Sequence, residues 1–382
     1  MDADTATARS DEAAMTAYFR AGEQRAAKLG NRGPIRYAPD GSIAPEILDA
    51  YLRTGFYIFE NVIRPEDLAE LQDEFSDLLD RLPVDPLSNR DAQGRCAIGS
   101  DLAGSMVRWS KPLGDPMGGT ARVGGRAPVK MFEPEPASDA PAQVPYLILG
   151  PLQFSDAALR IYGHRGLLSI AAAVNGEDFA PFNEVFIVKK PREGGSFAWH
   201  QDGITHWDRP DWTPIIHGFN FMVQLYGCTA VNGLWYVPGS HLLGKADIKA
   251  QVAAAGGNLL PDAVPLVCGP GDVAISNRQL VHASFPNTGE DWRVTLNMGF
   301  HPRSSVLNVA ASGPDVAPRF YDADHVRRRS EIIGYAIDAR RQRFPDETPY
   351  AYRPHRDAGL SYHWDEDARS RIRDYQRDDM LI

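Results

Sequence analysis

The chain has 382 residues, of which 43% are hydrophobic, and its 50 acidic and 40 basic side chains give a formal net charge of -10. This negative charge argues against nucleic acid or an anionic membrane surface as the main partner. The sequence has no secretory leader and no apolar run of ~18 residues that would predict a membrane span. Its three cysteines are far apart, which favours reduced thiols and a cytoplasmic protein.

Two helices and a short strand are predicted within residues 1–83. Apolar residues recur at helical spacing from Ser10 to Gly30, and a second helix is expected to begin at Pro65. The apolar run 56–59 between them predicts a strand.

Residues 84–150 are rich in glycine and proline, and periodicity fades over most of this segment. Loops of this length are often lids or binding segments, but a surface loop without a functional role fits the pattern equally well. A continuous helix is then expected from Ser155 to Val174, ending at Asn175-Gly176.

Short strands separated by turn residues dominate from Phe182 to Phe300. This pattern predicts a mainly β protein with helical additions, built around a double-stranded β-helix, which is a jelly-roll or cupin-like barrel. We expect a single catalytic domain over 1–382, with an N-terminal helical layer, a jelly-roll core over 151–302 and a C-terminal extension over 303–382. Arginines near 327–343 indicate an amphipathic helix with a solvated basic face. The alternative is that this basic surface attracts an acidic substrate.

The pair His200 and Asp202 is the most informative feature of the sequence. Residues two apart in a strand point to the same face, so an imidazole and a carboxylate at this spacing can bind one metal ion. His-x-Asp occurs four times in the chain, but only this pair follows an apolar, aromatic run and has a suitable histidine downstream.

His282 is that downstream histidine, and Ser284 shares its face of the strand. Two histidines and one carboxylate form the facial triad of non-heme Fe(II) oxygenases. The turn residues 286–291 are expected to form a hairpin that places Arg293 on the neighbouring antiparallel strand. A guanidinium there could hold the distal carboxylate of 2-oxoglutarate.

These motifs resemble the phytanoyl-CoA dioxygenase family of Fe(II)/2-oxoglutarate oxygenases over about residues 45–302. The shared features are Trp199-His200-Gln201-Asp202, Asn232-Gly233 before Pro238-Gly239-Ser240-His241, Pro270-Gly271-Asp272-Val273, His282-Ala283-Ser284 and Arg293.

The resemblance implies iron ligation by His200, Asp202 and His282. It also implies that Arg293 and Ser284 bind the 2-oxoglutarate C5 carboxylate. Asn220 would lie near the co-substrate and Trp207 near the substrate. Phe197 is a further candidate for the substrate pocket, although aromatic residues near a barrel mouth often serve packing alone. A second amide contact to the co-substrate is not evident, because Val188 or Lys189 falls at that position.

The function implied is hydroxylation, or a related oxidation, of an unactivated C–H bond in a small molecule. O2 would be consumed and 2-oxoglutarate converted to succinate and CO2. Two alternatives are a cupin-like metalloenzyme without dioxygen chemistry and a non-catalytic protein that binds 2-oxoglutarate or another metabolite. The sequence leaves open the substrate, the type of oxidation and the oligomeric state.

Overall fold

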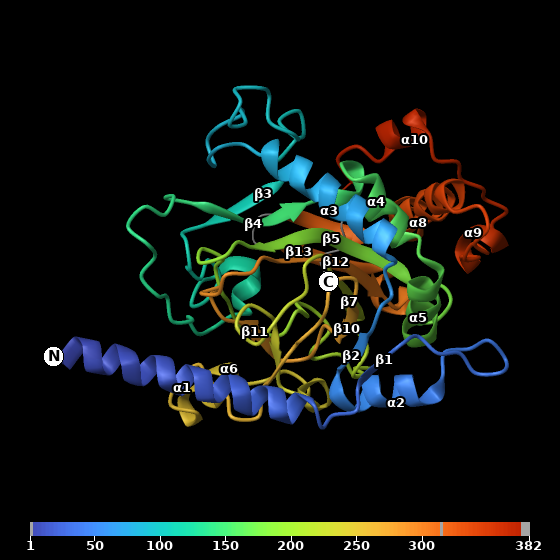
Figure 1. Cartoon of the computed structure of the whole chain (residues 1–382). Coiled ribbons are helices and arrows are strands. Elements are labelled where there is room, and N and C mark those ends of the chain that lie inside the picture. Colours follow the sequence, from blue (N-terminus) through green and yellow to red (C-terminus); the bar gives the residue numbers. More distant parts are fainter. Residues whose placement is uncertain (1–2, 314–315, 376–382) are drawn as a thin grey trace.

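Two β-sheets pack face to face in the computed structural model, which describes residues 3–313 and 316–375 (Figure 1). The larger sheet has eight strands in the order β1-β2-β10-β7-β12-β5-β4-β3, and the smaller has four in the order β6-β11-β8-β9. The strands of the larger sheet are β1 (Arg32–Gly33), β2 (Phe56–Phe59), β3 (Val107–Ser110), β4 (Val144–Leu149), β5 (Ala180–Lys189), β7 (Phe219–Gln224), β10 (Val273–Asn277) and β12 (Arg293–His301). Those of the smaller sheet are β6 (Phe197–His200), β8 (Trp235–Tyr236), β9 (Val264–Pro265) and β11 (His282–Ser284). A separate pair consists of β13 (Val309–Gly313) and β14 (Val316–Tyr321).

The inner faces of the two sheets contact each other through side chains that alternate along each strand. The Tyr236 hydroxyl on β8 lies 3.4 Å from the Met222 sulfur on β7. The neighbours of Met222, Phe221 and Val223, point the other way into the main hydrophobic core. This arrangement confirms the mainly β, double-stranded β-helix fold class predicted from the sequence.

Helices cover the outer faces of both sheets. Their bounds are α1 (Ala3–Ala26), α2 (Pro45–Thr54), α3 (Pro65–Asp80), α4 (Asp156–Tyr162), α5 (Arg165–Asn175), α6 (Ile248–Ala254), α7 (Arg303–Val306), α8 (Ala323–Arg343), α9 (Arg353–Asp357) and α10 (Glu366–Arg371). Three short 3₁₀ turns are η1 (Arg122–Gly125), η2 (Pro151–Gln153) and η3 (Ser240–Leu243). Side chains from α3, α4, α5 and α8 share one core with the outer face of the larger sheet. Figure 1 shows α3, α4 and α8 on the opposite side of the molecule from α1. Within the described residues, no helix is both long and apolar enough to cross a membrane.

The helix α1 lies against the smaller sheet, where Tyr18 stacks on Trp235 with ring centroids 4.6 Å apart. A Cβ atom at Gly22 would lie 2.4 Å from the Trp235 ring, so the glycine allows this close approach. The helix begins at Ala3, seven residues before Ser10, where the sequence predicted its start.

The helix expected over 155–174 is in fact two helices, α4 and α5. The break falls at Gly163, where a Cβ atom would lie 2.2 Å from the Ala336 carbonyl oxygen of α8. His164 then caps α5 by accepting a hydrogen bond from the Leu167 N–H. The close approach of a distant helix therefore sets this break, and the local sequence gives little sign of it.

The expected hairpin between the strands of His282 and Arg293 is wrong. β11 belongs to the smaller sheet, whereas β12 pairs with β5 and β7 in the larger one. The Asn287 side-chain amide donates to the carbonyl oxygens of Lys189, Lys190 and Asp291. These bonds lie where the chain passes from β11 in the smaller sheet to β12 in the larger one, so Ser284 and Arg293 lie in different sheets.

The segment 84–150 is more ordered than its composition suggested. It contains β3 and β4, which pair with each other and extend the edge of the larger sheet. Between these strands the chain forms the long connection 111–143, which we call the β3–β4 loop.

Candidate metal centre

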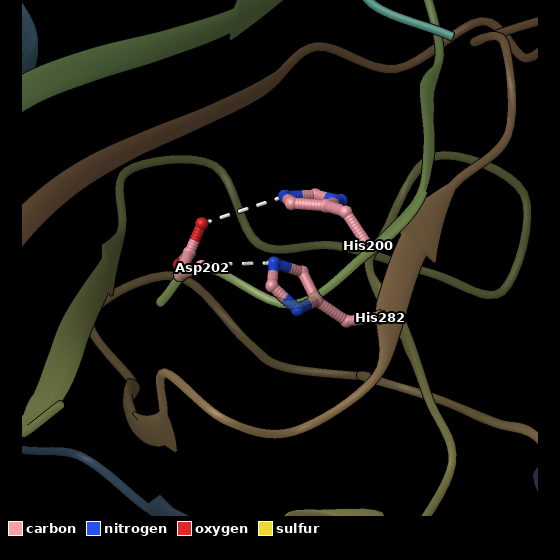
Figure 2. A group of neighbouring side chains, drawn as sticks. All are labelled: His200, Asp202 and His282. Atoms are coloured by element: carbon pink, nitrogen blue, oxygen red, sulfur yellow. Dashed lines mark ion pairs between the residues drawn. The ribbon is translucent and has the colours of Figure 1, made fainter. Parts of the chain in front are cut away.

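Three side chains meet at one point, as the sequence predicts: two from the smaller sheet and one, Asp202, from the segment just after β6 (Figure 2). His200 ends β6 and His282 begins β11, and the two residues are directly paired across these antiparallel strands. His200 Nε2 lies 3.4 Å from Asp202 Oδ1, and His282 Nε2 lies 3.9 Å from Asp202 Oδ2. One ligand atom from each residue lies within 4.8 Å of the other two. Two imidazole nitrogens and one carboxylate oxygen are a donor set that suits Fe(II) and related divalent ions.

The backbone orients both imidazole rings. His200 Nδ1 lies 2.7 Å from the Ala198 carbonyl oxygen, and His282 Nδ1 lies 2.8 Å from that of Leu280. A carbonyl oxygen only accepts, so each Nδ1 carries the proton and each Nε2 is left with a lone pair toward Asp202. Burial, followed by the nearby His200, lowers the pKa of His282 to about 4. His282 is therefore neutral near pH 7 and able to bind a metal ion.

Asp202 is held through both carboxylate oxygens and through its backbone. The Asn220 amide donates to Oδ2 at 2.9 Å, and the Arg126 guanidinium lies 2.9 Å from Oδ1. The Asp202 N–H donates to the Arg278 carbonyl oxygen at 2.7 Å. Burial alone would raise the pKa of Asp202, but Arg126 and the two histidines hold it well below its usual value. The carboxylate is therefore ionised.

Ser284 follows His282 by two residues on β11, Arg293 begins β12, and the polar side-chain atoms of both are unpaired among the described residues. Arg293 is fully buried, and all three of its guanidinium nitrogens lack a hydrogen-bond partner among the described residues. The Ser284 hydroxyl, which is also buried, has no partner in that part of the chain either. A buried guanidinium without a counter-charge is costly, so this position is suited to an anionic ligand. A carboxylate fits the planar donor pattern of arginine.

Lys189 is a second buried cation that the sequence did not assign. It lies opposite Arg293 on the adjacent strand, and its ammonium group donates to the Phe285 carbonyl oxygen. Burial, together with the charge of Arg293, holds the pKa of Lys189 well below its usual value. The position where an amide contact was sought therefore carries a lysine beside the guanidinium.

The aromatic residues proposed for the substrate pocket lie in chain segments next to the metal-site residues: Phe197 begins β6, which ends at His200, and Trp207 follows Asp202 by five residues. The Trp207 indole donates to the Gly203 carbonyl oxygen, and its ring lies 4.6 Å from that of His217. Phe197 packs against Tyr146 of β4, with ring centroids 5.6 Å apart. Both side chains are partly exposed, which keeps them available to a substrate.

Sequence reasoning did not identify Arg126 or Arg278, both of which contact Asp202. No motif marks either residue, because each reaches the site from a segment remote in sequence. Asn220 was expected near the co-substrate, and its amide donates to the predicted iron ligand Asp202.

Comparisons with known proteins agree with this geometry. Residues 147–295 match the family model described as phytanoyl-CoA dioxygenase (PhyH). The curated protein dioxygenase lolE1 of Epichloe uncinata is 29% identical over 159 residues, which is 40% of this chain and 56% of that protein. The matched region thus spans little more than half the length of this relative.

Among solved structures, EctD from S. alaskensis, crystallised with 2-oxoglutarate and 5-hydroxyectoine, has a TM-score of 0.51 at 19% identity. The match covers 76% of this chain and 86% of EctD, and it establishes similarity of fold. AviO1 from Streptomyces viridochromogenes Tue57 gives a TM-score of 0.44 at 21% identity, covering 72% of this chain and 96% of AviO1.

The resemblance expected from the sequence is therefore confirmed over the part of the chain that holds the site. Residues 147–295, which contain His200, Asp202 and His282, are similar to the phytanoyl-CoA dioxygenase (PhyH) family.

Proposed function

We propose that this protein is an Fe(II)- and 2-oxoglutarate-dependent oxygenase that oxidises a C–H bond of a small molecule. The observation that carries the proposal is the buried Arg293 guanidinium, which has no partner among the described residues, together with the cluster of His200, Asp202 and His282. Many enzymes have a metal site. A buried cation without a counter-ion is more specific, because it suits a keto acid that has a second carboxylate.

The residues divide into two groups by task. His200, Asp202 and His282 would hold Fe(II), with Asn220 fixing the orientation of the carboxylate. Arg293 and Ser284 would bind the distal carboxylate of 2-oxoglutarate, and the neighbouring Lys189 adds positive charge or a hydrogen-bond donor there. Bound iron would supply the activation of O2, coupled to conversion of 2-oxoglutarate to succinate and CO2 and to oxidation of the substrate.

The surroundings suit such chemistry because they exclude water. Both histidines, Ser284 and Arg293 are almost completely buried, and Tyr236 closes the inner face beside His282. Charges interact strongly in such surroundings, so a carboxylate on Arg293 would be held firmly.

Succinate release from 2-oxoglutarate tests this function directly. Wild-type protein supplied with Fe(II), 2-oxoglutarate and air should form succinate slowly without substrate. Asp202→Ala should abolish this release, and Asp211→Ala, which removes a surface carboxylate, should leave it unchanged.

The outcome also separates the two alternatives. A cupin-like enzyme without dioxygen chemistry would form no succinate, and its rate would not depend on air. A non-catalytic binding protein would bind 2-oxoglutarate and return it unchanged. Either result would overturn the proposal.

A further inference from the structure

Arg126 reaches the metal centre from the β3–β4 loop, which lies outside the PhyH match. Its Nη1 lies 2.9 Å from Asp202 Oδ1 and donates to the Asp202 carbonyl oxygen at 3.2 Å. Its Nε is buried and has no partner within the described residues. The side chain is 23% exposed, so it lies at the boundary between the metal centre and the outside.

The conformation of the β3–β4 loop places Arg126 beside Asp202. Val123, Gly124 and Gly125 have φ values of 47°, 68° and 68°, a left-handed turn that directly precedes Arg126. The Asp115 carboxylate accepts hydrogen bonds from the N–H groups of Met117, Gly118 and Met131. Through these hydrogen bonds, Asp115 holds residues 117, 118 and 131 of the β3–β4 loop together. Ala127, next to Arg126, is buried in the core beneath it.

Once a metal ion and 2-oxoglutarate are bound, Arg126 is left without a counter-ion. This step rests on the proposed function. In the metal-free protein Asp202 neutralises Arg126. A bound divalent ion would take up the charge of Asp202, and Arg293 together with that ion would balance the dianion 2-oxoglutarate. Arg126 then has no counter-charge of its own at a partly buried position, which favours an anion beside it.

The neighbours of Arg126 fit an anionic molecule with an apolar body. Tyr146 and Phe197 form an aromatic pair at this side of the site. Burial raises the pKa of Tyr146, and the charges of Arg122, Arg108 and Arg126 oppose the rise, so all three arginines are within electrostatic range of this ring. Arg108 and Arg122 donate to backbone carbonyl oxygens, and neither forms an ion pair within the described part of the chain.

We propose that the substrate of this protein carries an anionic group, of carboxylate or phosphate type, and that Arg126 binds it. The aromatic pair of Tyr146 and Phe197 contacts the apolar part of the same molecule. Arg126 is then a specificity-determining residue, and Arg108 and Arg122 draw anions toward it.

Calorimetric titration in two stages tests this assignment. The first stage loads the protein with Co(II), as a redox-stable substitute for Fe(II), and then with 2-oxoglutarate. The second stage titrates the loaded protein with phenylacetate, phenyl phosphate and the neutral phenylacetamide. Wild-type protein should bind at least one of the anionic probes about tenfold or more tightly than phenylacetamide, because an ionic hydrogen bond replaces a neutral one. The preferred anion distinguishes a carboxylate substrate from a phosphate.

Variants of two arginines in the same loop provide the control. Arg126→Gln should remove the preference for the anion, Arg126→Lys should retain part of it, and Arg122→Gln should retain most of it. Each variant should still bind Co(II) and 2-oxoglutarate.

The proposal is overturned if wild-type protein binds neither anion or binds phenylacetamide as tightly. It is also overturned if the preference survives Arg126→Gln, or if this variant no longer binds Co(II), since Arg126 would then act only through Asp202. Failure of wild-type protein at the first stage would instead count against the proposed function.

Discussion

The two ends of the site differ in how fully their polar groups are paired. At the metal end, both histidine Nδ1 atoms and both Asp202 oxygens have partners. At the anchor end, formed by Arg293 and Ser284, four side-chain nitrogen and oxygen atoms have none within the described residues. Protein groups alone thus prearrange the metal end, whereas the anchor end is completed only by a ligand. The following predictions test that contrast.

Replacing Arg293 should have opposite effects on stability and binding, and this is the largest effect we expect. Arg293→Met removes a buried charge without a counter-ion, so the ligand-free protein should become more stable by ~1 kcal/mol or more. Loss of the anchoring charge should weaken 2-oxoglutarate binding by about 100-fold, equivalent to ~2.7 kcal/mol. Thermal unfolding and calorimetry of the Co(II)-loaded protein measure the two quantities.

Arg192→Met is the matched control, since Arg192 is exposed and pairs with Glu290. It should change neither quantity appreciably. A destabilised Arg293→Met protein would mean that Arg293 already has a partner, and the contrast between the two ends would be lost.

Removing the amide of Asn220 should affect the metal end selectively. Asn220→Ala leaves Asp202 Oδ2 without its donor, so affinity for Co(II) should fall about 10- to 100-fold. Asn258→Ala, which removes an amide that donates to the Lys130 carbonyl oxygen, should not change it. If 2-oxoglutarate affinity fell while Co(II) affinity held, Asn220 would be a co-substrate contact, as the family resemblance first implied.

Ser284→Ala should have a smaller effect, limited to the anchor end. The lost hydrogen bond to the co-substrate should weaken 2-oxoglutarate binding by ~1 kcal/mol, or about fivefold. Co(II) binding should remain as in wild-type protein. An unchanged 2-oxoglutarate affinity would remove Ser284 from the anchor.

The smallest effect concerns the β3–β4 loop and depends on pH. Burial opposes ionisation of Glu133, but the Asp115 N–H, Lys111 and Lys130 lower its pKa to about 2. A depressed pKa means that the ionised carboxylate stabilises the folded state above its unfolded pKa of 4.5, and that this contribution is lost as pH falls toward 2.

Glu133→Gln should therefore lower stability at pH 7, and the difference from wild-type protein should shrink below about pH 4.5. Denaturant unfolding at several pH values measures it. A difference that grows on acidification would contradict the assigned direction.

The sequence predicted the fold class and the meeting of the three metal-site side chains because both depend on short-range patterns. The short His-x-Asp spacing keeps Asp202 close to His200 at the end of β6, and β11 carries His282 beside them. The family resemblance added Arg293 and Ser284, which lie on strands of different sheets.

What the sequence missed depends on long-range packing. Arg126 lies 76 residues from Asp202 in the chain and reaches it through a turn that no periodicity reveals. Lys189 is recognisable as a buried cation only once the register of β5 and β12 is known. The break at Gly163 similarly depends on how α8 packs.

A crystal structure of the protein with iron and 2-oxoglutarate, measured with anomalous scattering at the iron edge, tests the central claim most directly. We predict an iron peak between His200, Asp202 and His282, with the distal carboxylate of 2-oxoglutarate on Arg293. Iron bound elsewhere, or an Arg293 guanidinium still unpaired beside bound 2-oxoglutarate, would contradict it.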